Sequence, residues 1–90
     1  MMYVEFDLGE TRHVKIEIVS CKGEPFEILS ASYTLTARGD TEPESQVASV
    51  IMDHLIDQVI TPQKRGIYIL AVTYRIADET LIDKVEVRVK

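Results

Sequence analysis

The stretch "SVIMDHLIDQVITP", residues 49–62, decides the fold because it fits two kinds of secondary structure. As one helix over residues 42–60, it begins at a capping-box pattern formed by Thr41 and Glu44 and ends before Pro62. A helical stripe of apolar residues, Val47, Ile51, Leu55 and Val59, runs along it, with Ser49, Asp53 and Asp57 on the other side. This interpretation gives an α+β protein, in which a helix packs across an antiparallel sheet and the helix–sheet groove is the default pocket.

The same stretch can instead form two short strands. Residues 46–61 are rich in β-branched side chains, which favour strands. Asp53, in the central "MDH", is of a type that often starts a turn. The segments on both sides also have strand patterns, so a sandwich needs strands here as well. We therefore predict two strands over residues 46–61 with a break near Asp53 or His54, and the single helix remains the alternative.

Strict alternation of apolar and polar residues, the pattern of half-buried strands, runs through the rest of the chain. The sets predicted to point inward are Val4, Phe6 and Leu8; Val14, Ile16 and Ile18; Leu29, Ala31, Tyr33, Leu35 and Ala37; Tyr68, Leu70, Val72, Tyr74 and Ile76; and Val85, Val87 and Val89. Turns at residues 9–12 and 78–80 are expected to close an N-terminal and a C-terminal hairpin. With two strands in the middle, the chain has about seven.

The last of these strands ends the chain, and a terminal strand can lie at a sheet edge. Lys84, Arg88 and Lys90 are charges of the kind that discourage pairing between edges. We therefore expect a monomer in isolation.

Length and charge narrow the class of protein. Ninety residues suit one domain, residues 1–90. The net charge of −5 argues against nucleic acid and against anionic membranes as partners, apart from a small basic patch at Lys64 and Arg65. The start "MMYVEFDLGE" lacks the features of a signal peptide, so cytoplasmic synthesis without export is expected. No apolar run has the length needed to cross a bilayer.

One local motif links the pattern to a known class of domain. "KRGIYILAVTY" places Gly66 and Tyr68 at the entry to a long alternating strand. It resembles the tyrosine corner of immunoglobulin-like (Ig-like) domains, where a Tyr near the start of the penultimate strand bonds to nearby backbone. The Trp and the Cys pair of antibody domains are absent.

Two longer stretches, "VKIEIVSCKGEPFEILSASYTLTARGD" and "GIYILAVTYRIADETLIDKVEVRV", resemble small bacterial and bacteriophage Ig-like domains from about Val14 onward. In phage, such domains are small virion proteins or modules of capsid, tail and baseplate proteins. The resemblance implies an all-β, Ig-like antiparallel sandwich of about seven strands. It brings no active site to carry over to this chain.

Candidate binding residues each have a simpler interpretation. The integrin-type tripeptide "RGD", Arg38–Asp40, fits a polar turn in which Gly39 takes a special backbone conformation. His13 and His54, with Asp53 and Asp57 nearby, lack close metal-ligand spacing and are interpreted as surface residues.

Catalytic motifs give no stronger signal. Cys21 is the single cysteine, which excludes an internal disulfide, and beside Lys22 it is interpreted as an incidental thiol. The serines lack a G-x-S-x-G elbow, and the acidic residues lack EF-hand spacing. The acidic residues considered are Asp40, Glu42, Glu44, Asp78, Glu79 and Asp83. Tyr33, Tyr68 and Tyr74 are expected in the core. We thus predict no catalytic, cofactor-binding or metal-binding residues and no enzymatic activity.

Three functions remain as hypotheses. The first is a structural or protein-interaction module, a small virion-associated protein of a phage or prophage whose partners are other virion proteins. The second is an adhesion or carbohydrate-binding module of a larger surface assembly, with the loop at residues 38–40 as the contact. The third depends on the helical alternative and is an α+β small-molecule binder or enzyme, with Asp53, His54 and Asp57 at the rim of its groove. The first expects no small-molecule substrate.

Overall fold

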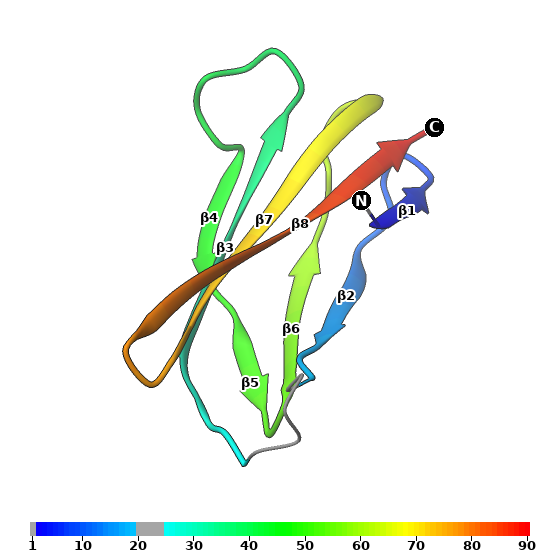
Figure 1. The fold of residues 1–90 in the computed structure, drawn as a ribbon. Coiled ribbons are helices and arrows are strands. Elements are labelled where there is room, and N and C mark those ends of the chain that lie inside the picture. The colour runs from blue at the N-terminus through cyan, green and yellow to red at the C-terminus, as the bar shows by residue number, and fades with distance from the viewer. Residues whose placement is uncertain (1, 20–24) are drawn as a thin grey trace.

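The computed structural model describes residues 2–19 and 25–90, which form strands joined by turns and loops (Figure 1). The strands are β1 (Met2–Phe6), β2 (Arg12–Glu17), β3 (Ile28–Ala37), β4 (Ser45–Ala48), β5 (Val50–Met52), β6 (Leu55–Ile60), β7 (Gly66–Ile76) and β8 (Glu79–Val89). These ranges contain no helix, and hence none that could cross a membrane. The protein is therefore all-β, and the helical alternative over residues 42–60 is wrong.

The strands form two sheets. One has five strands in the order β1-β8-β7-β3-β4, and the other has three in the order β2-β6-β5. Neighbouring strands are antiparallel except for β1 and β8, which run parallel with Met2 beside Val85 and Phe6 beside Val89. Figure 1 shows the resulting proximity of the N-terminal and C-terminal strands at one end of the molecule.

The predicted N-terminal hairpin is wrong, although its turn exists. The backbone N–H of Glu10 donates to the carbonyl of Asp7 at 3.1 Å, so the chain does turn after β1. Instead of returning beside β1, the chain enters the other sheet, where β2 pairs with β6. β1 pairs instead with β8, and this covers the C-terminal half of β8. The expectation that β8 lies at an edge is therefore wrong for residues 85–89.

The deciding stretch contains strands, as predicted, and turns where predicted. Met52 pairs with Leu55 across a two-residue loop, in which Asp53 has a φ of 55°. Asp tolerates this left-handed conformation better than most residues do. The chain also changes sheet at Ser49, because β4 belongs to the five-stranded sheet and β5 to the three-stranded one. Because β4 and β5 are therefore separate strands, the described residues form eight strands, one more than the seven predicted.

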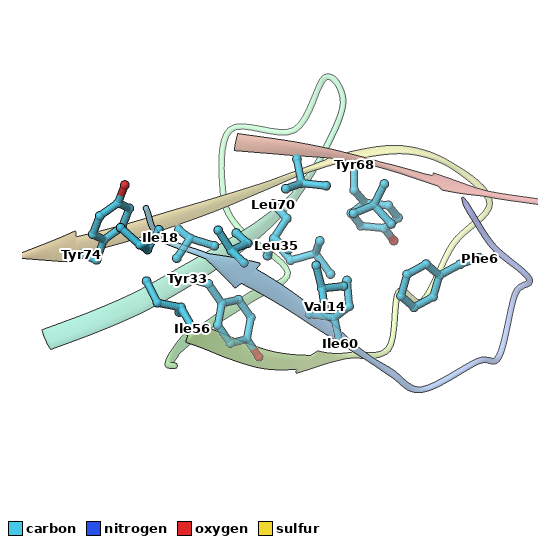
Figure 2. Close-up of a cluster of buried hydrophobic side chains, with 14 of the residues drawn as sticks. Phe6, Val14, Ile18, Tyr33, Leu35, Ile56, Ile60, Tyr68, Leu70 and Tyr74 are labelled. Atoms are coloured by element: carbon cyan, nitrogen blue, oxygen red, sulfur yellow. The ribbon is translucent and has the colours of Figure 1, made fainter. Parts of the chain in front are cut away.

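The core lies between the two sheets and draws on both (Figure 2). Its buried apolar residues are Phe6, Val14, Ile16, Ile18, Ile28, Tyr33, Leu35, Ile56, Ile60, Tyr68, Leu70, Val72, Tyr74, Val85, Val87 and Val89. The inward sets predicted for β2 and β7 and the three valines predicted for β8 are confirmed. A sandwich-like arrangement with one shared core follows.

Two residues predicted to point inward are exposed. Leu8 follows the end of β1 and lies in the turn, where the alternation of the strand no longer applies. In β3, the register shifts between Ile28 and Ser30, so Leu29 is the extra residue of a β-bulge. The bulge buries Ile28 and leaves Leu29 exposed, which reverses the prediction.

The C-terminal hairpin is confirmed, with its turn slightly earlier than predicted. Ile76 pairs with Glu79, so Ala77 and Asp78 form the loop, and Thr80 belongs to β8. Ala77 has a φ of 54°, an unusual conformation for a residue with a side chain.

Candidate functional site

The Arg38–Asp40 tripeptide forms a tight exposed turn at the end of β3, as expected. The backbone N–H of Asp40 donates to the carbonyl of Ala37 at 3.0 Å, and Gly39 has a φ of 91°. Both charged side chains have partners within the chain: Lys64 lies 3.3 Å from Asp40, and Glu86 lies 3.4 Å from Arg38. Because such exposed ion pairs contribute only about 0–1 kcal/mol, both groups can still exchange partners.

A shallow hollow of about 310 Å³ opens beside this turn, between it and the connection from β6 to β7. Arg38, Asp40, Lys64 and Arg65 line it. The basic patch expected at Lys64 and Arg65 is therefore joined by Arg38, but Asp40 in the same hollow offsets part of its charge. The hollow therefore carries charges of both signs, and this arrangement does not indicate a catalytic group.

Tyr68 makes the contact predicted for it. Its hydroxyl accepts a hydrogen bond from the backbone N–H of Lys64, four residues upstream, at 3.0 Å. The same hydroxyl donates to Glu44 Oε1 at 2.8 Å. Burial of the ring, followed by the bond to Glu44, raises the pKa of Tyr68 above its usual value. Tyr68 thus holds two loops together at one end of the sheets.

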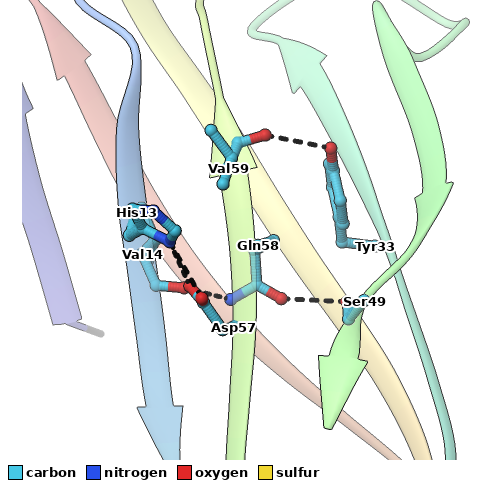
Figure 3. Close-up of polar contacts among 7 residues, drawn as sticks. All are labelled: His13, Val14, Tyr33, Ser49, Asp57, Gln58 and Val59. Atoms are coloured by element: carbon cyan, nitrogen blue, oxygen red, sulfur yellow. Dashed lines mark hydrogen bonds and ion pairs between the residues drawn. The ribbon is translucent and has the colours of Figure 1, made fainter.

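The two histidines and the nearby aspartates do not form one site. On β2, His13 Nδ1 contacts the carboxylate of Asp57 on β6, at 2.8 and 3.0 Å (Figure 3). His54 lies elsewhere, in the β5–β6 turn, where its ring stacks on Phe26 and its Nε2 is 3.0 Å from the Phe26 carbonyl. Within residues 2–19 and 25–90, no three His, Cys, Asp or Glu side chains come together as metal ligands do. Asp53 and His54 therefore lie together in the turn, with Asp53 Oδ1 3.8 Å from His54 Nε2, whereas Asp57 lies apart from them against His13.

Gln58 is a buried polar residue that sequence reasoning missed. Its side chain points into the core and is 2% exposed. Its Nε2 donates to the Val14 carbonyl at 2.6 Å, and its Oε1 accepts from the Ser49 hydroxyl at 2.9 Å (Figure 3). The Ser49 N–H also donates to the Ala31 carbonyl at 3.0 Å. Gln58 and Ala31 therefore fix the residue at which the chain changes sheet.

The remaining candidates add no site. Tyr33, Tyr68 and Tyr74 are buried, as predicted. Asp83 accepts a hydrogen bond from the Tyr74 hydroxyl at 3.3 Å. Cys21 and Lys22 fall outside the described residues.

The strongest candidate is a surface that sequence reasoning did not single out. We define the neutral edge as residues 45–52, "SQVASVIM", which comprise β4, Ser49 and β5 and contain no charged residue. Within the described ranges, β4 pairs only with β3 and β5 only with β6, so each leaves one side of its backbone free. Val47, Val50 and Met52 are 52%, 59% and 45% exposed. The neutral edge therefore offers free backbone groups together with apolar side chains.

The other edges of the described sheets carry charges. Glu5 lies on β1, and β2 has Arg12, Lys15 and Glu17. The part of β8 that β1 leaves uncovered contains Asp83, opposite the buried Val72, and Lys84. Charged residues on an edge, and inward-pointing ones in particular, discourage pairing with another strand. The neutral edge lacks this protection.

Comparison with known proteins provides no relative on which to rest a function. No protein-family model matches the chain, and neither curated proteins nor solved structures gave a significant match.

Proposed function

We propose that this protein is a structural or protein-interaction module without enzymatic activity, and that its fold is an Ig-like sandwich. The observation that carries the proposal is the neutral edge. An edge strand with free backbone groups and exposed apolar side chains can bind another polypeptide through main-chain hydrogen bonds. Since the sheet is already formed, little ordering of this surface is needed when a partner binds.

The strand order supports the Ig-like part of the proposal. The three-stranded sheet β2-β6-β5 corresponds to strands B, E and D of Ig-like domains, and β3-β7-β8 corresponds to C, F and G. Tyr68, near the start of β7, bonds to the backbone upstream as the tyrosine corner does. One departure is β1, which joins β8 instead of β2.

We further propose that the module is a small virion-associated protein of a phage or prophage. The support is the resemblance of residues 14–90 to Ig-like domains of phage virions. The test is mass spectrometry of particles purified after prophage induction in the strain that encodes the chain. We expect the protein in the particles at a fixed ratio to the major structural proteins. Its consistent absence from washed particles, despite its presence in the lysate, would refute the virion role.

An adhesive function has one observation in its favour, the exposed Arg38–Asp40 turn beside a hollow. In this alternative, the Asp40 carboxylate binds the partner after leaving Lys64, and Asp40→Ala abolishes attachment to an integrin-coated surface. Glu86→Gln is the matched control, because it frees Arg38 from its ion pair and leaves the turn intact. Equal attachment of Asp40→Ala and the wild type would show that the turn is not the adhesive contact.

A further inference from the structure

We propose that the neutral edge binds one extended segment of a partner protein, apolar in its middle and basic at both ends, as an added strand. The inference rests on the proposed interaction function and specifies the chemistry of the partner. It follows from three properties of the edge: its free backbone, its change of sheet at Ser49 and the charges beyond its two ends.

The change of sheet selects a flexible segment over a rigid folded edge. β4 has four residues and β5 has three, and they belong to different sheets. A rigid strand of another folded domain can follow only one of them, and it gains few hydrogen bonds from so short a strand. A flexible segment can pair with β4, bend at Ser49 and continue along β5. Ser49 itself is held by Ala31 and Gln58, so the path along the edge is already fixed.

The charges at the ends argue against a second copy of this chain. Glu44 immediately precedes the neutral edge, and the exposed Asp53 immediately follows it. In an antiparallel pair of two copies centred on the edge, Asp53 of each copy lies opposite Glu44 of the other. In a parallel pair, each acidic residue lies beside its own equivalent. Both arrangements bring carboxylates together, and each copy also carries a net charge of −5.

The same charges are complementary to a segment with basic ends. Lys or Arg at one end would meet Glu44 and the exposed Glu42, and at the other end Asp53. The middle of the segment would place alternate apolar side chains against Val50 and Met52, which share one face of β5, while the residue beside Val47 would point to the opposite face. The open end of β3, residues 28–30, lies on the same side of its sheet as β4 and is also uncharged, which extends the apolar surface.

The test uses ¹⁵N-labelled full-length protein and two synthetic peptides. Both have a centre of about eight alternating Val and Thr residues, a length that spans the edge. One peptide has two Lys residues at each end, and the other has two Glu residues. We expect the Lys-ended peptide to shift the amide signals of residues 46–52 and to slow their hydrogen exchange. The Glu-ended peptide should bind at least about fivefold more weakly, with a difference that shrinks as salt is added.

Two variants make the test specific to the edge. Val50→Lys places a charge on the neutral edge at an exposed position, so it should weaken binding of the Lys-ended peptide at least about tenfold. Ile82→Lys is the matched control, because Ile82 is similarly exposed but lies on β8, and it should bind as the wild type does. Circular dichroism of both variants verifies that the fold is intact.

Several results would overturn the inference. These are no binding of either peptide, equal binding of both, or equal binding by the wild type and Val50→Lys. A dimer that sedimentation detects in the wild type and that Val50→Lys abolishes would assign the edge to a second copy instead.

Mass spectrometry of purified particles separates this inference from the proposed virion role. Equal incorporation of the wild type and Val50→Lys would refute the inference alone, and absence of the wild type would refute the virion role alone.

Discussion

Replacing Tyr68 by Phe tests whether its hydroxyl stabilises the fold. The substitution keeps the ring, which is 1% exposed, and removes only the oxygen. Two hydrogen bonds are lost with it: the one accepted from the Lys64 N–H and the one donated to Glu44. Because nothing else in the core changes, the change in the free energy of unfolding reports these two bonds.

The magnitude follows from the nature of the two partners. A neutral hydrogen bond contributes about 1 kcal/mol, and a bond to a charged group about 1.5–3 kcal/mol. Glu44 is exposed, so water can replace part of its lost bond, and the lower half of the range applies. We expect Tyr68→Phe to lower the free energy of unfolding by about 2–3 kcal/mol. For a chain of this size that corresponds to a fall of about 10–20 °C in Tm.

Urea titration followed by circular dichroism measures this loss, since the whole domain should remain folded in water. A chain of ninety residues has a stability of about 5–13 kcal/mol, so the variant retains a folded state. Tyr3→Phe is the matched control, because Tyr3 lies exposed on β1 and its change should stay within about 0.5 kcal/mol.

A double-mutant cycle isolates the contact with Glu44. Combining Tyr68→Phe with Glu44→Ala should give a coupling energy of about 1 kcal/mol or more. A loss below about 0.5 kcal/mol for Tyr68→Phe, or a coupling energy near zero, would refute the role assigned to this hydroxyl.

Four further predictions use the same unfolding assay. Because the pKa of Tyr68 is raised in the folded state, stability should fall as pH rises from about 10, where the unfolded tyrosine ionises, and urea titrations between pH 9 and 11 should show a smaller fall in Tyr68→Phe. Ile28→Ala should cost about 2–5 kcal/mol and Leu29→Ala less than about 0.5 kcal/mol; the reverse order would contradict the β-bulge. Ala77→Gly should stabilise the protein by about 0.5 kcal/mol, because relief of the positive φ outweighs the added flexibility of Gly, and a lower Tm would count against this. Gln58→Leu should cost about 1–3 kcal/mol by removing the two side-chain hydrogen bonds of Gln58, to the Val14 carbonyl and the Ser49 hydroxyl, and an unchanged urea midpoint would show that the amide is dispensable.

The sequence predicts the strands well where one face is buried. In β7, alternation identified every inward residue from Tyr68 to Ile76, because side chains on a strand alternate between the core and the opposite face. In the middle of the chain, the strands were predicted from β-branched residues, from Asp53 as a turn former and from the strand patterns on both sides, and they are confirmed. Val47 and Val59, which belong to the apparent helical stripe, are exposed, whereas Ile56 and Ile60 are buried. The helical spacing was therefore coincidental.

Pairing between strands is much harder to predict, because it depends on contacts that are distant in sequence. β1 and β2 have the alternation and the turn of a hairpin, yet they belong to different sheets. What separates them is the free side of β8, where each residue of β1 pairs with the residue 83 positions further along the chain. The bulge at Leu29 is similar, since its extra residue is recognised only from the register against β7.

The neutral edge could not be recognised from the sequence for the same reason, because it too depends on how the strands pair. An uncharged run such as "SQVASVIM" is equally suited to a central strand, where both sides of the backbone are paired. It becomes a candidate binding edge only because β4 and β5 each have a single neighbour. Gln58 is likewise unremarkable in sequence, and its importance comes from the position of Ser49, to which it bonds.

Glu44 connects the two most informative parts of the molecule. In the sequence it completes the capping-box pattern that favoured a helix, but its carboxylate instead accepts from the Tyr68 hydroxyl and, at 3.3 Å, from the Gln63 N–H. Its own N–H donates to the Leu35 carbonyl at 2.7 Å. Glu44 is thus held at three points, directly before β4 begins at Ser45. The contact of Tyr68 therefore fixes an acidic group at the start of the neutral edge, which is where the proposed partner segment needs a carboxylate in a defined position.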